Sequence, residues 1–299
     1  MTKVAVVCGG QSSEREVSLR SGNSVARALE RAGYDVRVLD TTASDAELQE
    51  CDVVFPVLHG VGGEDGQFQA RLEAMSLPFV GSGSEASKLC MDKSTYRDYM
   101  KRADFLLPAG ATMNYETYIA SNFAGQPHVV KPVDGGSSID THITRDVLTR
   151  DEKAIRDSFA RHGSMIVEEL IEGDELTIGV LGEQALPVIE IIPPANGEFD
   201  FANKYNGQTQ EICPTPNFSE NVQAQARELA ERVHKAAGCR DLSRSDFILT
   251  KDGTFYLLET NTIPGLTDQS LFPKAALATG HDMLALCDRL VQFALSRAA

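Results

Sequence analysis

The chain has 299 residues, 42% of them hydrophobic, which is enough apolar material for two or three packed domains and argues against intrinsic disorder. Its 43 acidic and 28 basic residues give a net charge of −15, so a nucleic-acid partner is disfavoured. No apolar run approaches the length of a membrane span, and no signal-peptide pattern precedes the first apolar strand. We therefore expect a cytoplasmic protein without a membrane partner.

The six cysteines argue against a structural metal or disulfide framework. They are scattered and form no CxxC pair, so buried, reduced thiols are expected. They are Cys8, Cys51, Cys90, Cys213, Cys239 and Cys287.

The first third of the chain alternates apolar strands with helices. A helix is expected over residues 16–32, and strands are expected over residues 4–8, 36–39, 52–58 and 78–80. This alternation predicts a parallel sheet that is covered on both faces. Ligands bind such sheets at the carboxyl ends of the strands, where Gly9-Gly10 and His59-Gly60 lie.

The middle third contains a candidate phosphate site. A polar helix is expected over residues 87–103, and strands over 128–132 and 164–170. Lys131 ends the first of these strands, and the glycine- and serine-rich segment 134–138 follows it. Small residues let backbone N–H groups approach phosphate oxygens, and a lysine adds positive charge. A plain surface loop is the alternative. The segment does not fit the Walker pattern, so a P-loop fold is not supported.

The last third begins with two strands, over residues 176–181 and 186–192, that we expect to be antiparallel around a turn. A long loop is expected over residues 203–216. Apolar residues at helical spacing from Val222 to Ala236 then predict a helix. The chain ends in a helical tail from about Pro273.

Two expected strands of this last third carry a candidate metal site. Asp246 precedes an apolar run, while Glu259 ends another and Asn261 follows it by two residues. If these strands are neighbours, the three side chains reach one point. Carboxylate and amide oxygens suit Mg²⁺, which leaves coordination places for phosphate. The alternative is ordinary polar residues at strand ends.

Other polar residues have both a structural and a functional interpretation. Glu14 is a helix-start acid favoured by the helix dipole, or a carboxylate that binds a substrate ammonium. His59 has a structural role, with its ring nitrogens hydrogen-bonded within the fold, or it belongs to a substrate site. Lys93 is a surface lysine, or a phosphate ligand if it faces a cleft. Arg244 would lie beside the metal strand, where a guanidinium stabilises a developing oxyanion.

Together these segments resemble the D-alanine–D-alanine ligases of the ATP-grasp superfamily. The resemblance runs nearly from end to end, and the order and spacing of the motifs are more specific than any one of them. The motifs are residues 9–18 (GGQSSEREVS), 58–60 (LHG), 63–66 (GEDG), 81–83 (GSG), 91–93 (MDK), 130–132 (VKP), 136–138 (GSS), 204–205 (KY), 243–246 (SRSD) and 259–267 (ETNTIPGLT).

The resemblance implies an α/β fold with a three-domain ATP-grasp architecture. Residues 1–86 would form an N-terminal α/β substrate-binding domain built on a parallel sheet. Residues 87–167 would form a central ATP-grasp domain, and residues 168–299 a C-terminal ATP-grasp and catalytic domain. ATP would lie between the central and C-terminal sheets. The resemblance also suggests a homodimer.

The resemblance assigns residues to ATP and to metal. Phosphate groups would be bound by three lysines, Lys93, Lys131 and Lys204. Adenine would be contacted by Glu168, Glu169 and Ile171, and the ribose by Glu175. Asp246, Glu259 and Asn261 would bind a pair of Mg²⁺ or Mn²⁺ ions.

The implied reaction joins two D-alanine molecules for peptidoglycan precursor synthesis. ATP would phosphorylate the first carboxylate, and the second amine would attack the acyl phosphate. Glu14 and His59 would bind the first D-alanine, and Ser270 and Leu271 the carboxylate of the second. The oxyanion would be held by Arg244 and the backbone N–H of Gly265. Glu14, Ser137 and Tyr205 would form a hydrogen-bonded set. This set would close the loops and help to deprotonate the amine of the second D-alanine.

The chain departs from the family pattern at three places. Gly135 replaces the usual glutamate of the phosphate loop, and residues 139–140 (Ile-Asp) replace Val-Gly. Asp140 would add negative charge near ATP. Asp241 stands where the family commonly has glycine.

Two alternatives to D-alanine ligation stay open from the sequence. One is an ATP-grasp ligase with a different amino-acid or hydroxy-acid acceptor, although Tyr205 favours an amine nucleophile. The other is a nucleotide-binding homologue with impaired catalysis. The retained Lys131, Arg244, Asp246, Glu259 and Asn261 argue against it.

Overall fold

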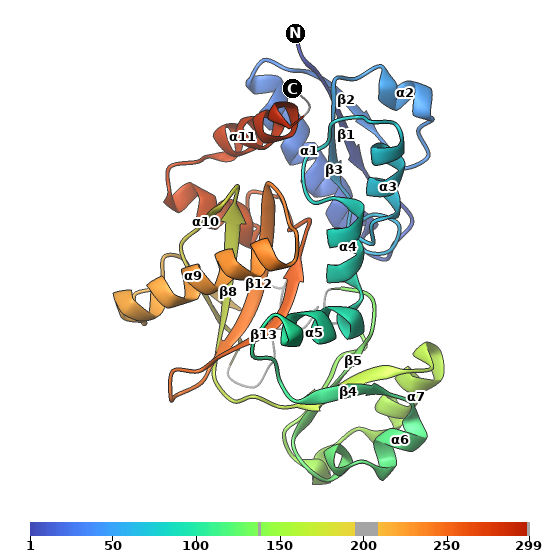
Figure 1. Ribbon diagram of the computed structural model, residues 1–299, viewed down its shortest axis with the longest axis vertical. Helices are drawn as coiled ribbons and strands as arrows, with labels where there is room; N and C mark the ends of the chain where they lie inside the picture. The colour runs from blue at the N-terminus through green and yellow to red at the C-terminus, as the bar shows by residue number, and fades with distance from the viewer. Residues whose placement is uncertain (137–138, 195–208, 298–299) are drawn as a thin grey trace.

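The computed structural model describes residues 1–136, 139–194 and 209–297. Within these ranges the strands form one parallel sheet and two antiparallel sheets, which follow one another along the chain. Figure 1 shows the parallel sheet at one end of the molecule and the sheet of the middle segment at the other.

The N-terminal sheet has three parallel strands, which are β1 (Lys3–Cys8), β2 (Asp35–Leu39) and β3 (Val53–Val57), with β1 in the middle. Its apolar side chains alternate between two buried clusters. The helix α1 (Arg15–Arg31) covers one face, and the helices α2 (Asp45–Gln49) and α3 (Gln67–Ala74) cover the other. The expected parallel sheet with two covered faces is confirmed.

The prediction of a fourth strand over residues 78–80 is wrong. Only Phe79 forms a bridge, to Val54 of β3. Pro78 has no N–H to donate, and Gly81 turns the chain with a φ of +98°. The ladder therefore stops after one bridge.

Asp92 divides the expected helix over residues 87–103 into α4 (Ser84–Met91) and α5 (Lys93–Arg102). The backbone of Asp92 is extended, and its carboxylate accepts a hydrogen bond from the Thr95 N–H at 2.9 Å. This is the geometry of a helix N-cap, which aspartate favours. The single expected helix is therefore wrong, and the break places Lys93 at the first residue of α5.

The middle segment forms a four-stranded antiparallel sheet backed by two helices. In spatial order the strands are β4 (Gly110–Met113), β7 (Met165–Glu169), β5 (His128–Pro132) and β6 (His142–Thr144). The helices are α6 (Tyr115–Ala120) and α7 (Glu152–His162), with short 3₁₀ turns η1 (Asn122–Gly125) and η2 (Val147–Thr149). Tyr118 of α6 stacks on Phe159 of α7, with ring centroids 5.4 Å apart. The two strands expected here are confirmed.

The third sheet carries the C-terminal half of the chain. Its strands are β8 (Asp174–Leu181), β9 (Gln184–Ala185), β10 (Ile189–Ile192), β11 (Gln210–Ile212), β12 (Leu242–Leu249) and β13 (Phe255–Asn261). The strand expected over residues 186–192 is present as β10, which is antiparallel to β8 as expected, and β9 adds a short antiparallel pairing before it. The helix α9 (Glu220–Ala236) packs Ala226, Ala230 and Val233 against this sheet. The loop expected over residues 203–216 is wrong at 210–212, because β11 pairs with β10.

The chain ends in two helices, α10 (Leu271–Ala278) and α11 (Met283–Ser296), which confirm the expected helical tail. The helix α11 returns to the N-terminal sheet and lies beside α1 (Figure 1), where Leu290 and Val291 share a core with Leu29. The Tyr34 hydroxyl donates to Asp288 of α11 at 2.6 Å. No described helix combines the length and the apolar character needed to cross a membrane.

Asp241, one of the departures from the family pattern, ties the N-terminal segment to the C-terminal one. Its φ of +61° lies in the left-handed region, which glycine adopts without strain and aspartate tolerates better than most residues. The buried carboxylate accepts from the Gly81 N–H at 2.8 Å and from Arg297 Nη2 at 2.9 Å. Arg297 also donates to the Phe79 carbonyl at 2.8 Å. One buried carboxylate therefore links three separate segments.

We predict that Arg297→Ala destabilises the protein by about 2–3 kcal/mol, because the Asp241 carboxylate stays buried and loses its counter-ion. Urea unfolding of the full chain measures the change. In an Asp241→Gly background, which removes the buried charge and the left-handed strain, Arg297→Ala should cost much less. Equal costs in both backgrounds would contradict this account of the junction.

Candidate active site

The pairing of β12 with β13 gathers four polar side chains on one face of the sheet. Arg244 lies opposite Asn261, and Asp246 lies opposite Glu259. Because side chains alternate along a strand, both pairs point to the same side. The register shifts after Asp246 at a β-bulge, a feature often found beside active sites. The structure thus brings Asp246, Glu259 and Asn261 together, as the sequence suggested.

An ion pair joins two of these side chains along β12. Arg244 Nε and Nη2 donate to the two carboxylate oxygens of Asp246 at 3.0 and 2.9 Å. The Thr177 hydroxyl of β8 donates to the same carboxylate. Burial lowers the pKa of Arg244, but the charge of Asp246, the hydrogen bonds to its carboxylate and the charges of Glu259 and Glu64 together raise the pKa overall. Arg244 is therefore a fixed cation at the site.

A first cavity of about 440 Å³ lies between the middle sheet and the C-terminal sheet. Residues of β5, the end of β7, the start of β8 and the last three residues of β10 line it. The residues expected to bind nucleotide or metal that line this cavity are Lys93, Lys131, Glu168, Glu169, Ile171, Glu175, Asp246 and Glu259.

The acidic end of β7 is already paired inside this cavity. Glu168 is buried, and its carboxylate lies 2.6 Å from Lys131 Nζ and also pairs with Arg97. The Glu169 carboxylate accepts from the Ala109 N–H at 2.7 Å. These side chains are therefore engaged with the protein, and the residues that follow, Leu170 and Ile171, line the same wall of the cavity.

A second cavity, of about 710 Å³, lies between the N-terminal segment and the C-terminal sheet. The expected substrate and catalytic residues that line it are Glu14, His59, Arg244, Gly265, Ser270 and Leu271, together with the expected metal ligands Glu259 and Asn261. The two cavities meet at Lys93, Gly135, Gly136 and Glu259, which line both.

Lys93 lies at this junction. Its ammonium donates to the Gly135 carbonyl at 2.6 Å and lies 3.7 Å from Glu259 Oε2. The break in the helix at Asp92 fixes this position, since Lys93 begins α5 and its own N–H donates to the Val133 carbonyl at 2.9 Å. A cation is thus placed where the contents of both cavities would meet.

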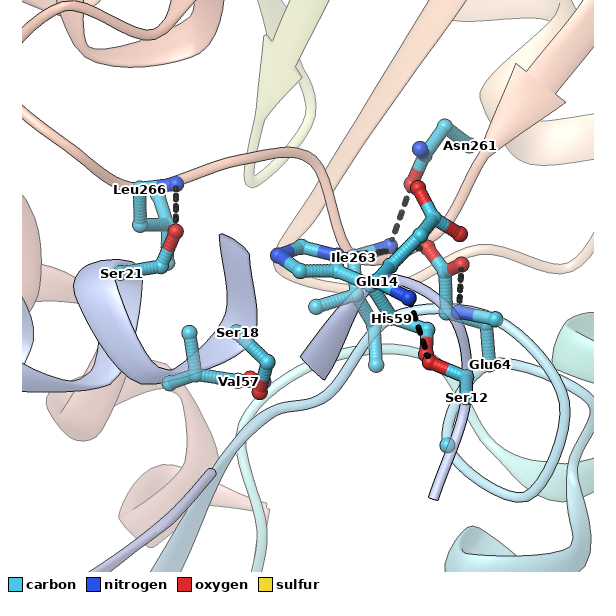
Figure 2. A network of polar contacts seen from close by, with 12 residues as sticks. Ser12, Glu14, Ser18, Ser21, Val57, His59, Glu64, Asn261, Ile263 and Leu266 are labelled. Carbon is cyan, nitrogen blue, oxygen red and sulfur yellow. Dashed lines mark hydrogen bonds and ion pairs between the residues drawn. The ribbon is translucent and has the colours of Figure 1, made fainter. Parts of the chain in front are cut away.

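The N-terminal side of the second cavity is a small polar network (Figure 2). The Ser12 hydroxyl donates to the His59 carbonyl at 2.6 Å and accepts from the Glu14 N–H at 3.2 Å. His59 Nδ1 lies 3.8 Å from the Glu64 carboxylate, which accepts from the Gly60 N–H at 2.7 Å. Among the described residues, the buried Nε2 of His59 has no hydrogen-bond partner. A buried nitrogen of this kind suits contact with a bound ligand.

The Glu14 carboxylate also touches the glycine-rich loop. A Cβ built on Gly136 would lie 3.0 Å from Glu14 Oε2, so a larger residue at position 136 would push the Glu14 carboxylate aside. Residues 137 and 138 of the same loop lie outside the described ranges. The expected roles of Ser137, Lys204 and Tyr205 therefore concern residues outside the described part of the chain.

The opposite side of the second cavity is the turn after β13. The Asn261 amide oxygen accepts from the Ile263 N–H at 2.8 Å, and Ser21 of α1 accepts from the Leu266 N–H at 3.3 Å (Figure 2). A Cβ on Gly265 would lie 2.9 Å from Ser270 Oγ, which leaves room for glycine alone. The turn is thus held from both ends, with Gly265 and Ser270 close together.

Asp140 is not among the residues that line the first cavity, contrary to the expectation that it would add charge near ATP. Its carboxylate turns away to the end of α7, where it lies 2.6 Å from Arg161 Nη2 and 2.8 Å from His162 Nε2. Its φ of +56° lies in the left-handed region, which aspartate and glycine tolerate. Its neighbours Ile139 and Thr141 line the first cavity, so Asp140 anchors the loop beside that cavity.

The oxygen ligands fit Mg²⁺ in number and type. In the described part of the chain no group of three or more His, Cys, Asp or Glu side chains is arranged to hold a metal. Mg²⁺ does not need such a cage, because one or two carboxylates and substrate phosphates commonly hold it. Asp246 and Glu259 would supply the carboxylates for such an ion, and the Asn261 oxygen keeps a lone pair beside the one used by Ile263.

Two family models match the chain. The model described as "D-ala D-ala ligase N-terminus" matches residues 3–46 and 36–82, and "D-ala D-ala ligase C-terminus" matches residues 105–292. The chain belongs to the D-alanine–D-alanine ligase family. It is 40% identical over 293 residues to the D-alanine–D-alanine ligase of Syntrophotalea carbinolica, an alignment that covers 97% of this chain and 95% of the relative.

Solved structures of ligases in this family have the same fold. The D-alanine–D-alanine ligase of Bacillus anthracis has a TM-score of 0.84 at 29% identity, and the match covers 100% of this chain and 99% of that one. A second structure of that ligase, complexed with ATP, has a TM-score of 0.84 at 27% identity, with the same coverage. The expected ATP-grasp fold is thereby confirmed, and the chain is an ATP-dependent ligase.

Three residues of this ligase site were not singled out from the sequence. Glu64 belongs to the motif at residues 63–66, but the resemblance assigns it no role. No sequence pattern indicated a role for Thr177, because its partner Asp246 belongs to another strand. Arg97 lies four residues after Lys93, on the same side of α5, and helical spacing was the one available signal.

We predict that Asp140→Ala weakens ADP binding about two- to tenfold, because two exposed ion pairs of about 0.2–1 kcal/mol each no longer hold the loop in place. Isothermal titration calorimetry measures the affinity. Asp157→Ala is the matched control, since it removes an exposed pair within α7 that does not touch the loop. Unchanged ADP affinity in Asp140→Ala would contradict the anchoring role.

Proposed function

We propose that this chain joins two D-alanine molecules to D-alanyl-D-alanine, through an acyl phosphate made from ATP, for peptidoglycan precursor synthesis. The observation that carries the proposal is the meeting of the two cavities at Lys93 and Glu259. A phosphoryl group held in the first cavity would face a carboxylate held in the second. Membership of the D-alanine–D-alanine ligase family supports the choice of substrates.

ATP would occupy the first cavity. Lys93 and Lys131 would bind its phosphates, and Lys204 would add a third cation. The backbone after Glu168 and Glu169, as far as Ile171, would contact the adenine. Glu175, at the start of β8, would bind the ribose. The commitment of the Glu168 carboxylate to Arg97 and Lys131 supports backbone recognition of the base over recognition by that side chain.

Asp246, Glu259 and Asn261 would hold one or two Mg²⁺ or Mn²⁺ ions. When bound, such ions neutralise charge on the transferring phosphoryl group. The protein supplies further positive charge from Lys93 and Arg244. Arg244 lines the second cavity while its partner Asp246 lines the first, so this pair forms part of the wall between them.

The two amino acids would lie in the second cavity. Glu14 would bind the ammonium of the first D-alanine, and the unpaired Nε2 of His59 supports a role for that ring in the same subsite. Ser270 and Leu271, at the start of α10, would hold the carboxylate of the second, where helix N–H groups favour an anion.

Peptide-bond formation would use groups around the same cavity. Arg244 and the backbone N–H of Gly265 would stabilise the oxyanion that forms when the amine attacks. Glu14 would act with Ser137 and Tyr205 to close the loops and to assist loss of the amine proton. Closure matters because water would hydrolyse an acyl phosphate. The contact of Glu14 with Gly136 supports this link between substrate and loop.

We further infer a three-domain organisation, over residues 1–86, 87–167 and 168–299, in a cytoplasmic homodimer without nucleic-acid or membrane partners. The succession of three sheets supports the division, although β7 (Met165–Glu169) crosses the second boundary and α11 packs on the first segment. The net charge of −15 supports the absence of a nucleic-acid partner. Light scattering after size-exclusion chromatography would test the dimer.

The proposed function predicts ADP release that requires both D-alanine and Mg²⁺, with D-alanyl-D-alanine as the product by mass spectrometry. A panel of D- and L-amino acids and D-lactate tests the acceptor. Another dipeptide or an ester as the main product would show a different acceptor. No ADP release with any acceptor would contradict ligase activity.

We predict that Glu14→Gln raises the KM for D-alanine at least tenfold while the Kd for ADP stays within about twofold, because a charge-assisted contact to the ammonium is lost. Steady-state kinetics and calorimetry give the two values. Glu16→Gln, on the same helix turn but outside the cavity, is the control. A parallel loss of ADP affinity would contradict the assignment of Glu14 to the amino-acid site.

A further inference from the structure

Arg97 is a buried cation one helical turn after Lys93. Its side chain is 5% exposed, and it faces the middle sheet from α5. One end of the guanidinium pairs with Glu168, and Nη2 donates to the Pro108 carbonyl at 2.7 Å. Burying a guanidinium is costly unless its partners satisfy it, so its position is strongly determined.

Glu168 connects Arg97 to the first cavity. Its second carboxylate oxygen lies 2.6 Å from Lys131 Nζ, so one carboxylate bridges two cations. Lys131 and Glu168 line the cavity, whereas Arg97 stands behind them and does not. The order from the interior to the cavity is therefore Arg97, Glu168, Lys131.

The charges of Arg97, Glu168 and Lys131 determine the net charge that a ligand in the first cavity meets at Lys131. A Lys131–Glu168 pair alone is neutral, and such a pair attracts a phosphate weakly. Arg97 adds a second, permanent positive charge, so the three groups together carry a formal charge of +1. Because the guanidinium engages the far oxygen of Glu168, the positive surplus lies at Lys131, on the cavity side.

Arg97 also fixes the wall next to this lysine. Pro108, whose carbonyl Arg97 holds, lines the first cavity. The following residue, Ala109, donates its N–H to the Glu169 carboxylate at 2.7 Å. The same guanidinium thus fixes the position of the Lys131–Glu168 pair and the position of the segment that enters β4.

We propose that Arg97 is a positioning residue for ATP: through Glu168 it holds the Lys131 ammonium at the cavity and leaves it the positive charge that binds phosphate. The inference rests on the proposed function in one respect, which is that the first cavity takes the phosphates of a nucleotide. Arg97 does not touch the nucleotide itself.

The test compares ADP with adenosine, which has the same base and ribose but no phosphate. Calorimetry on the full chain at fixed MgCl₂ measures both affinities for wild type and Arg97→Met. The role predicts at least a tenfold loss for ADP and less than a twofold change for adenosine. Arg102→Met, an exposed arginine on the same helix, is the control and should change neither.

Two further variants keep the proposal testable if Arg97→Met folds poorly. Arg97→Lys retains the cation and should keep ADP affinity within about threefold of wild type. Arg97→Met/Glu168→Gln removes both charges behind Lys131, so the net charge at the cavity returns to +1 and ADP affinity should recover in part, although the contact that positions the ammonium is lost. A purely structural role predicts no recovery in the double variant.

Equal losses for ADP and adenosine in Arg97→Met, or no loss for either, would overturn the proposal. Failure of the proposed function has a different signature. A wild-type protein that binds ADP but forms no dipeptide would refute the ligase function and leave the Arg97 comparison intact. A wild-type protein that binds neither ADP nor adenosine would refute both.

Discussion

The antiparallel pairing of β12 with β13 is the constraint on which both cavities depend. Its register sets Asp246 opposite Glu259 and Arg244 opposite Asn261, on one face of the sheet. A slip of β13 by one residue against β12 would turn Glu259 and Asn261 to the other face, into the apolar core under α9 and away from Arg244 and Asp246. The bulge after Asp246 confines the polar face to the end of the hairpin, and Phe247 and Leu257 return to that core.

Each cation around this face is matched with a carboxylate. Arg244 pairs with Asp246, Lys93 lies near Glu259, and Lys131 shares Glu168 with Arg97. Buried or partly buried charges are stable only when they are paired, so the fold can keep its cations in place before any ligand binds. A phosphate-bearing ligand would then meet positions that are already fixed. This preorganisation is the physical link between the fold and phosphoryl transfer.

The local features of the fold could be predicted from the sequence. Apolar runs predicted the strands of the parallel sheet, and helical spacing predicted α9, because each pattern reflects the face that an element buries. The convergence of Asp246, Glu259 and Asn261 followed from two adjacent strands. Errors arose where one residue overrides a pattern. Asp92 caps a new helix, and Pro78 prevents a fourth ladder.

Contacts between distant segments could not be predicted in this way. Arg97 and Glu168 are 71 residues apart, and Asp241 and Arg297 are 56 apart. Neither pair has a local pattern, because its partners meet only when separate elements pack together. The resemblance to known ligases identified the expected site residues but not these supporting contacts. The left-handed φ of Asp241 and Asp140 is visible only in the folded backbone.

The central claim is that a phosphoryl group crosses from the first cavity to a carboxylate in the second at their junction. The most direct measurement uses D-alanine labelled with ¹⁸O in its carboxylate and follows the label during dipeptide synthesis. If an acyl phosphate forms, the carboxylate oxygen that accepts the phosphoryl group leaves with it, and the released inorganic phosphate carries one ¹⁸O atom. Dipeptide formation with unlabelled phosphate would contradict the account.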